Sequence, residues 1–147
     1  MTETIQALTD QEVEKLARDW YRALDVHVPI EELWPMLATE GLAFVFPEGE
    51  RNGVEGFRVW YDAVTHRFFD EVHTVKEVKS KANGNSADVS VVVNWQAKIW
   101  DAPEANSKWL GFDAYQTWVV TRGPKGTPVI KKYVVDSLKA MEGSASL

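Results

Sequence analysis

The sequence predicts an α+β fold, with helices first along the chain and antiparallel strands last. Between residues 9 and 68, apolar side chains recur at the three- and four-residue spacing of a helix, whereas after residue 70 they alternate with a period of two. Neither an internal repeat nor a linker interrupts this order. We therefore expect a single domain over residues 1–147, with an ordered core at about residues 9–140 in which helices form a layer on a sheet.

Three helices are predicted in the first half of the chain. The first begins at Thr9 and Glu12, which have the spacing of a capping box. Its inward stripe consists of Val13, Leu16, Ala17, Trp20 and Leu24. Pro29 suits the first turn of a second helix, which Pro35 should shorten or kink, and Asn52 can cap a third. The inward stripe of that third helix consists of Phe57, Trp60, Tyr61, Val64 and Phe68.

Most of the predicted strands lie in the second half of the chain. A short strand at residues 42–46 is followed, after the third helix, by strands at residues 73–81, 86–100, 108–122 and 129–138. Asn83-Gly84 is a strong signal for a two-residue hairpin turn, which would place His73 opposite Asn94. A one-residue bulge midway would exchange the two faces of the strand beyond it, so the face on which His73 lies stays open. Residues 1–7 and 142–147 are expected to fray.

The composition excludes several classes of function. Cysteine is absent, which rules out disulfides, zinc–thiolate sites and thiol nucleophiles. The three histidines do not share a metal-ligand spacing, the net charge is −6, and no apolar stretch approaches the ~20 residues that span a bilayer. We expect a cytoplasmic protein without a metal ion or cofactor, and without nucleic-acid or membrane partners.

Three segments of the chain resemble one known family. They are DWYRALDVHVPIEELWPMLATEGLAFVFPEGERNGVEGF, FFDEVHTVKEV and VIKKYVVDSL. Their order and spacing, over roughly residues 10 to 140, are similar to those of the nuclear transport factor 2-like superfamily, especially its SnoaL-like branch. The resemblance implies a cone, in which three N-terminal helices pack on a strongly curved antiparallel sheet and leave a pocket at the wide end. It also implies a homodimer formed through the outer surface of the sheet.

The seven tryptophans are explained if the helices and the bent sheet leave a hollow lined by large flat side chains. From strand parity and the resemblance together, we expect the following side chains to point inward: Trp20, Phe44 or Phe46, Trp60, Gln116, Trp118, Val134 and Asp136. The candidate ligand-binding residues are Trp20, Phe46, Trp60, Tyr61, Asn94, Gln116 and Trp118. The alternative, in which these aromatic rings fill a solid core, stays open.

The resemblance also suggests reactions, and the residues eliminate some of them. The family's ketosteroid isomerases need a carboxylate where this chain has Phe46, and its epoxide hydrolases need an Asp-Arg-Asp set, whereas no Arg-x-Asp occurs here. Dehydratases and polyketide cyclases remain. His73 stands where the family often has a pocket histidine, and an imidazole suits proton transfer. The Tyr-Asp pair of the dehydratase first helix has no clear counterpart, because Trp20 and Tyr21 stand there.

Two hypotheses about function follow. The first is a protein that binds a small, flat, apolar molecule, possibly a polycyclic aromatic one, without an assigned reaction. The second is a cofactor-free acid–base enzyme, similar to a dehydratase or polyketide cyclase, in which His73 and Asp136 handle protons. His73 could instead be a surface or capping group, and Asp136 could face solvent. The enzyme hypothesis gains if both side chains enter one hollow and loses if they lie on opposite faces of the sheet.

Overall fold

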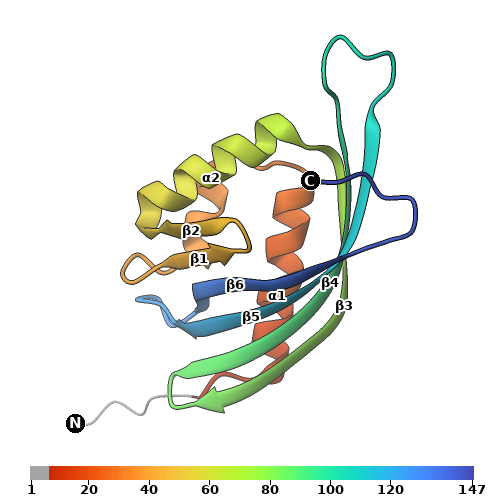
Figure 1. Ribbon diagram of the computed structural model, residues 1–147. Coiled ribbons are helices and arrows are strands. Elements are labelled where there is room, and N and C mark those ends of the chain that lie inside the picture. The colour runs from red at the N-terminus through yellow and green to blue at the C-terminus, as the bar shows by residue number, and fades with distance from the viewer. Residues whose placement is uncertain (1–6) are drawn as a thin grey trace, which may run out of the picture.

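The computed structural model describes residues 7–147, which form a curved six-stranded sheet with two α-helices against it (Figure 1). The helices are α1 (Asp10–Asp25) and α2 (Gly53–Arg67), and the short 3-10 turns η1 (Ile30–Glu32) and η2 (Trp34–Met36) lie between them in the chain. The strands are β1 (Ala43–Phe46), β2 (Gly49–Asn52), β3 (Phe69–Asn83), β4 (Ser86–Ile99), β5 (Lys108–Arg122) and β6 (Pro128–Ala140). The expected fraying of residues 1–6 lies outside the described residues.

Helix α1 has the start and the buried face that the sequence predicts. The Thr9 hydroxyl accepts the Glu12 backbone N–H at 3.1 Å, and the Glu12 carboxylate accepts the Thr9 N–H, which completes the capping box. All five residues of the predicted stripe are buried. The same face also buries Tyr21, so α1 presents two large aromatic side chains to the sheet.

The segments between α1 and α2 differ from the predicted pattern. The second predicted helix is not continuous, because Pro35 cannot donate a backbone hydrogen bond, and η1 and η2 replace it. Strand β2 was not predicted at all; it pairs with β1 as a hairpin whose turn contains Pro47 and Glu48. Asn52 is the N-cap residue of α2, as predicted, although its side chain makes no capping hydrogen bond.

The strands lie in the order β2-β1-β6-β5-β4-β3 (Figure 1). All neighbouring pairs are antiparallel except β1 and β6, so the predicted all-antiparallel sheet is wrong at that single junction. Because β1 pairs with β6, the early part of the chain joins the same sheet as the late strands, and α1 lies across its inner face.

Bulges in β3 and β6 decide which side chains reach the inside of the sheet. The β3–β4 turn is made by Gly84 and Asn85, and a register shift then leaves Lys76 without a partner, so that His73 lies opposite Trp95 and not Asn94. A second shift leaves Asp136 unpaired between the partners of Tyr115 and Gln116 on β6. A bulge moves every later side chain to the other face. His73 therefore faces inward, and the predicted inward orientation of Asp136 is wrong.

The C-terminal segment contacts β5, and the fraying expected for residues 142–147 stays a prediction. Beyond the end of β6, Gly111 and Trp109 of β5 still have free backbone groups on that edge. Gly111 accepts the Met141 N–H at 2.8 Å, and Trp109 accepts the Ala145 N–H at 2.9 Å. The segment then reaches the inner face of the molecule, where Leu147 lies at an opening.

Candidate functional site

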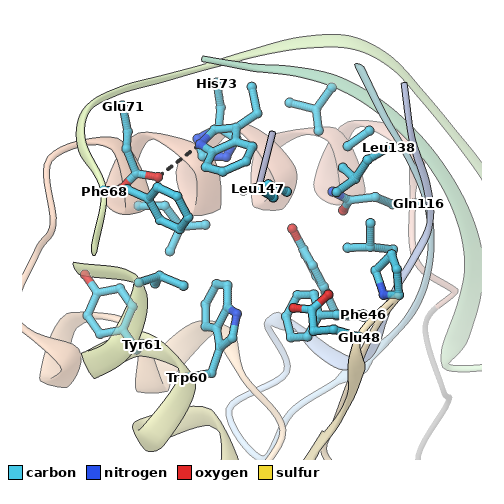
Figure 2. Close-up of a pocket in the computed structure, with 18 of the residues that line it drawn as sticks. Phe46, Glu48, Trp60, Tyr61, Phe68, Glu71, His73, Gln116, Leu138 and Leu147 are labelled. Atoms are coloured by element: carbon cyan, nitrogen blue, oxygen red, sulfur yellow. Dashed lines mark hydrogen bonds between the residues drawn. The ribbon is translucent and has the colours of Figure 1, made fainter. Parts of the chain in front are cut away.

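A cavity of about 160 Å³ opens between the inner face of β3–β6, the C-terminal half of α2 and the β1–β2 turn. Its lining is mostly aromatic and aliphatic, and Figure 2 shows these side chains around an empty centre. A dry cavity of about 150 Å³ is known to hold benzene. The space therefore accommodates one six-membered ring, and a site of this kind, apolar with a few converging polar groups, is typical of small-molecule binding.

His73 lies in the wall of this cavity and is paired with a carboxylate at the end of α1. Asp25 accepts the His73 backbone N–H at 3.0 Å through one oxygen and bonds His73 Nδ1 at 2.6 Å through the other. A carboxylate that holds both groups fixes the position of the imidazole as well as its tautomer, because Nδ1 must carry the proton to donate it.

Two aromatic rings hold the imidazole in its plane. The Tyr21 ring stacks on His73 with centroids 4.7 Å apart, and the Trp95 ring stacks on it at 6.2 Å. With Nδ1 bonded to Asp25, the lone pair lies on Nε2, which has no protein hydrogen-bond partner within residues 7–147. The imidazole is thus oriented, its accepting nitrogen has no protein partner in the described residues, and its side chain lines the cavity.

A second imidazole–carboxylate pair lies next to the first. Glu71 precedes His73 by two residues on β3, and it lines the cavity with a side chain that is 8% exposed. Its Oε1 accepts the Trp95 indole N–H at 3.0 Å, and its Oε2 bonds Nε2 of His27. In the described part of the chain, no three His, Asp or Glu side chains come close enough together to hold a metal ion.

The Tyr61 hydroxyl is engaged outside the cavity. It donates to the backbone carbonyl of Val28 at 2.6 Å. Burial, together with the negative charges of Glu71 and Glu32, raises the pKa of Tyr61 to about 12. The phenol is therefore neutral at physiological pH, and its contribution to the cavity is the face of its ring.

A buried amide, that of Gln116, lines another part of the cavity wall (Figure 2). Oε1 of Gln116 accepts the Tyr21 O–H at 2.7 Å and the Trp118 indole N–H at 2.9 Å. An indole can only donate, so these bonds fix which end of the amide carries the oxygen and leave the NH₂ group as the part a ligand can use. Burial raises the pKa values of Tyr21 and Tyr133, whose hydroxyl groups lie 3.1 Å apart.

The structure brings together some of the sequence-predicted site residues and separates others. The residues that line the cavity are His73, Phe46, Trp60, Tyr61 and Gln116. Trp20 and Trp118 are 0% exposed and lie behind the cavity wall in the packed core. Asn94 is buried on the other face of the sheet, where its amide donates to Asp113 at 3.0 Å.

Asp136 is not the partner of His73. Its side chain is exposed on the outer face, where it accepts the Thr117 hydroxyl at 2.7 Å. His73 and Asp136 lie on opposite faces of the sheet, so the hypothesis that they form a proton-handling pair is wrong. Asp25 is instead the carboxylate that contacts His73.

Sequence reasoning missed Asp25 and Glu71, although each left a signal. Asp25 follows Tyr21 by four residues, which puts both on one face of α1, so the first helix does contain a tyrosine and an aspartate that meet at the site. Glu71 and His73 are two residues apart, the spacing that puts side chains on one face of a strand. His27 gave no comparable signal, because its place depends on how the chain leaves α1.

Comparison with known proteins bears on the fold. No protein-family model matches the sequence, and no curated protein is detectably similar to it in sequence. Among solved structures, a nuclear transport factor 2-like superfamily protein from Salmonella enterica is 13% identical and aligns with a TM-score of 0.67 over 93% of this chain and 92% of its own. This chain has the nuclear transport factor 2-like fold.

Two other structural neighbours with this fold are named as enzymes or candidate enzymes. The hexachlorocyclohexane dehydrochlorinase LinA-type3 from Novosphingobium barchaimii is 14% identical, with a TM-score of 0.70 over 93% of this chain and 92% of its own. A candidate scytalone dehydratase from Novosphingobium aromaticivorans is 16% identical, with a TM-score of 0.71 over 93% of this chain and 87% of its own. At these identities the likeness establishes the nuclear transport factor 2-like fold and not the reaction.

Proposed function

We propose that the protein is a cofactor-free enzyme that removes a proton from carbon in a small ring compound and thereby expels a neighbouring leaving group. The observation that carries this proposal is the pairing of His73 with Asp25. It leaves Nε2 of a fixed imidazole as the proton acceptor on the wall of an apolar cavity. Removal of a proton by a positioned imidazole contributes typically about 10²- to 10⁴-fold to a rate.

The proposed step is an elimination. Nε2 of His73 takes a proton from a ring carbon, and the electron pair of the broken C–H bond forms a C=C bond to the next carbon. The leaving group departs from that second carbon with its own bonding pair. The imidazole then carries a positive charge, which the Asp25 carboxylate stabilises at 2.6 Å, until the proton is returned to water. Asp25 is a positioning residue, since it acts through His73.

The structural neighbours support an elimination in general terms. The name of one describes the loss of hydrogen chloride from a chlorinated cyclohexane, and that of the other describes a loss of water. An elimination of either kind that forms a C=C bond removes a proton from carbon. A cavity of about 160 Å³ suits one ring better than the polycyclic frameworks that the sequence analysis allowed. The cone-shaped chamber and the homodimer formed through the outer sheet surface stay predictions.

The test uses a probe that reports a base in an apolar cavity. The C–H proton of 5-nitrobenzisoxazole is removed by a base as its N–O bond breaks, and the phenolate product is coloured. Only its five-membered ring has to reach His73, so the nitro-substituted ring can lie at the opening of the cavity beside Leu147. We expect His73→Ala to slow this reaction by about 10²-fold. His66→Ala is the matched control, because His66 lies on α2 with a side chain 79% exposed, and it should have no effect. Equal rates for all three proteins would contradict the proposal and leave simple ligand binding as the function.

Asp25→Asn separates positioning from structure. An amide can flip and present its NH₂ to Nδ1, which would move the imidazole proton to Nε2 and abolish the acceptor. We expect the variant to lose most of the 5-nitrobenzisoxazole activity while remaining folded. Nitrogen-15 NMR of the imidazole should show Nδ1 protonated in the wild-type protein and Nε2 protonated in the variant. An unchanged tautomer with unchanged activity would remove Asp25 from the mechanism.

A further inference from the structure

We propose that Glu71 and His27 form a second polar site in this cavity, which selects molecules that carry a hydroxyl group or a protonated amine and rejects carboxylates and phosphates. The inference deepens the proposed function and rests on it, since it names the substrate class for the cavity that His73 serves. It is carried by the hydrogen bonds of Glu71, by the backbone around it and by the charges of the lining.

The Glu71 carboxylate is fixed in place as an acceptor. The Trp95 indole N–H holds Oε1 at 3.0 Å, and His27 holds Oε2. Each carboxylate oxygen has a second lone pair, so both can accept a further hydrogen bond from a ligand. Figure 2 shows Glu71 on the same side of the cavity as His73. A donor bound to Glu71 would therefore lie close to the carbon that His73 deprotonates.

The backbone at both ends of this contact adopts a conformation that side chains disfavour. His27 has φ = 52° and follows the C-cap of α1, and Asp70, next to Glu71, has φ = 50°. The His27 N–H bonds the Leu24 carbonyl and the Val28 N–H bonds the Ala23 carbonyl, a helix ending that usually places glycine where His27 stands. A histidine in this position costs backbone free energy that a glycine would avoid, and strain of this kind is typical of functional sites.

The charges of the cavity wall point the same way. None of the lining residues is Lys or Arg, whereas Glu71 lies inside and Glu48 stands in the β1–β2 turn at the rim. The faces of Trp60, Phe68 and Trp95 add the negative side of aromatic rings, which attracts cations. An anionic ligand would lose its water and meet the like charge of the Glu71 carboxylate, with neither Lys nor Arg in the lining to offset it, which is costly. A hydroxyl or ammonium group would gain a charge-assisted hydrogen bond.

This selectivity distinguishes the chain from one of its structural neighbours. Hexachlorocyclohexane, the compound in that neighbour's name, has no group that can donate a hydrogen bond from nitrogen or oxygen. When bound, it would place chlorine atoms against the buried Glu71 carboxylate and would offer that carboxylate no hydrogen-bond donor of its own. We therefore place this chain with alcohols or amines of one-ring size as substrates, and not with polychlorinated rings.

The test compares four one-ring probes that differ in a single substituent: toluene, benzyl alcohol, benzylamine and benzoate. Two-dimensional NMR titration of the full chain at pH 7 gives the affinity of each and identifies the residues whose signals move. We expect benzylamine to bind about tenfold or more tightly than benzoate. The ammonium group of benzylamine can donate a hydrogen bond to the Glu71 carboxylate, whereas the carboxylate of benzoate cannot donate and carries the same charge as Glu71. The shifted signals should include those of Glu71 and Trp95.

Glu71→Gln keeps the shape of the side chain and removes its charge. It should weaken benzylamine binding by about tenfold, weaken benzyl alcohol less, and leave toluene unchanged. Glu77→Gln is the matched control, because Glu77 lies on the same strand outside the cavity, and it should alter none of the four affinities. Benzoate that binds wild type as tightly as benzylamine, or benzylamine that binds Glu71→Gln unchanged, would overturn the proposal.

Binding is measured here without turnover, so its outcome is independent of the elimination. If His73→Ala keeps the preference for benzylamine while wild type fails to open 5-nitrobenzisoxazole, the proposal for the Glu71 site stands and the proposed reaction fails. If wild type opens 5-nitrobenzisoxazole but shows no preference among the probes, the reaction stands and the proposal for the Glu71 site fails.

Discussion

The two halves of the protein interior contain similar side chains but pack them differently. In the closed half, which consists of Trp20, Phe44 and Phe57 with the residues around them, these three side chains are 0% exposed and their ring centroids lie 4.9 to 6.2 Å apart. In the open half, which consists of the cavity and its lining, the Trp60 and Trp95 rings border a space of about 160 Å³. Aromatic content alone therefore does not decide where a pocket forms.

Polar side chains account for the difference. In the closed half, the rings of Trp20, Phe44 and Phe57 pack against one another, and even the Trp20 indole N–H is buried there without a hydrogen-bond partner in the described part of the chain. In the open half, His73, Glu71 and Gln116 take their hydrogen bonds from neighbours within the wall, so each is held at the wall and cannot fold into the centre. The bonds that satisfy these buried groups also keep the space between them open.

The strongest test of this comparison uses two phenylalanines of the same strand. Phe44 lies in the closed half and Phe46, two residues later, lines the cavity. We expect Phe44→Ala to lower the free energy of unfolding by about 3–5 kcal/mol, because the ring leaves a new void among five aromatic neighbours. Phe46→Ala should cost only about 1–2 kcal/mol, because one side of that ring already borders space.

Urea denaturation of both variants measures the two values, and ligand binding separates them further. Phe46→Ala enlarges the existing cavity and should shift its preference toward larger ring compounds, whereas Phe44→Ala should not. Equal losses of stability would show that the two halves are packed alike, which would contradict the division drawn here.

Much of the fold was accessible from the sequence, because its signals are local. The capping box at Thr9 and Glu12 marked the start of α1, and the period-two pattern marked β4 and β5 to within one residue of their ends. The parallel pairing of β1 with β6 was not accessible, because nothing in either segment specifies a partner about 90 residues away. Strand β2 was missed because its four residues, Gly-Glu-Arg-Asn, contain no apolar side chain that could alternate with polar ones.

The candidate site was harder to predict, because it depends on bulges in β3 and β6. An unpaired residue at Lys76 turns His73 inward, and an unpaired Lys131 exchanges the faces of β6 before Asp136, which then lies outward. Neither position carries a glycine or proline that would mark a bulge in the sequence. The alternative that a bulge would exchange the faces near His73 was the correct one. Residue types indicated an acid beside the histidine, and only the packing of α1 against β3 identified it as Asp25.

Gln116 tests whether polar groups support the boundary between the two halves. Gln116→Met keeps most of the side-chain volume but removes the acceptor of both the Tyr21 hydroxyl and the Trp118 indole N–H. We expect it to lower the free energy of unfolding by about 1–3 kcal/mol, because buried donors without an acceptor lose their solvation. Tyr21→Phe in the same background removes one of those donors and should recover part of the loss in a double-mutant cycle. No coupling between the two changes would contradict this role for Gln116.

The smallest effect concerns the far end of the closed half, where α1 begins. Arg122 of β5 donates two hydrogen bonds of 2.8 Å to the Glu12 carboxylate, and these bonds lower the pKa of Glu12 to about 2. Because the pKa in the folded state lies below the unfolded value of 4.5, the contact stabilises the fold above pH 4.5 and is lost as the pH falls toward 2. The Glu12 side chain is 32% exposed, so solvent screening reduces the effect at neutral pH to about 1 kcal/mol.

Glu12→Gln isolates this contribution, because glutamine can keep the capping box while it removes the charge that faces Arg122. We expect the variant to be about 1 kcal/mol less stable than wild type at pH 7 and equally stable at pH 2, with the difference shrinking between pH 4.5 and 2. Urea denaturation across that range measures it. Glu14→Gln is the control, because Glu14 pairs only with Arg18 on the exposed side of the same helix and should cost no more than about 0.5 kcal/mol. If the difference in the free energy of unfolding between Glu12→Gln and wild type stays unchanged at pH 2, the residue stabilises α1 through its cap and not through its charge. The acid sensitivity of the closed half would then come from other groups.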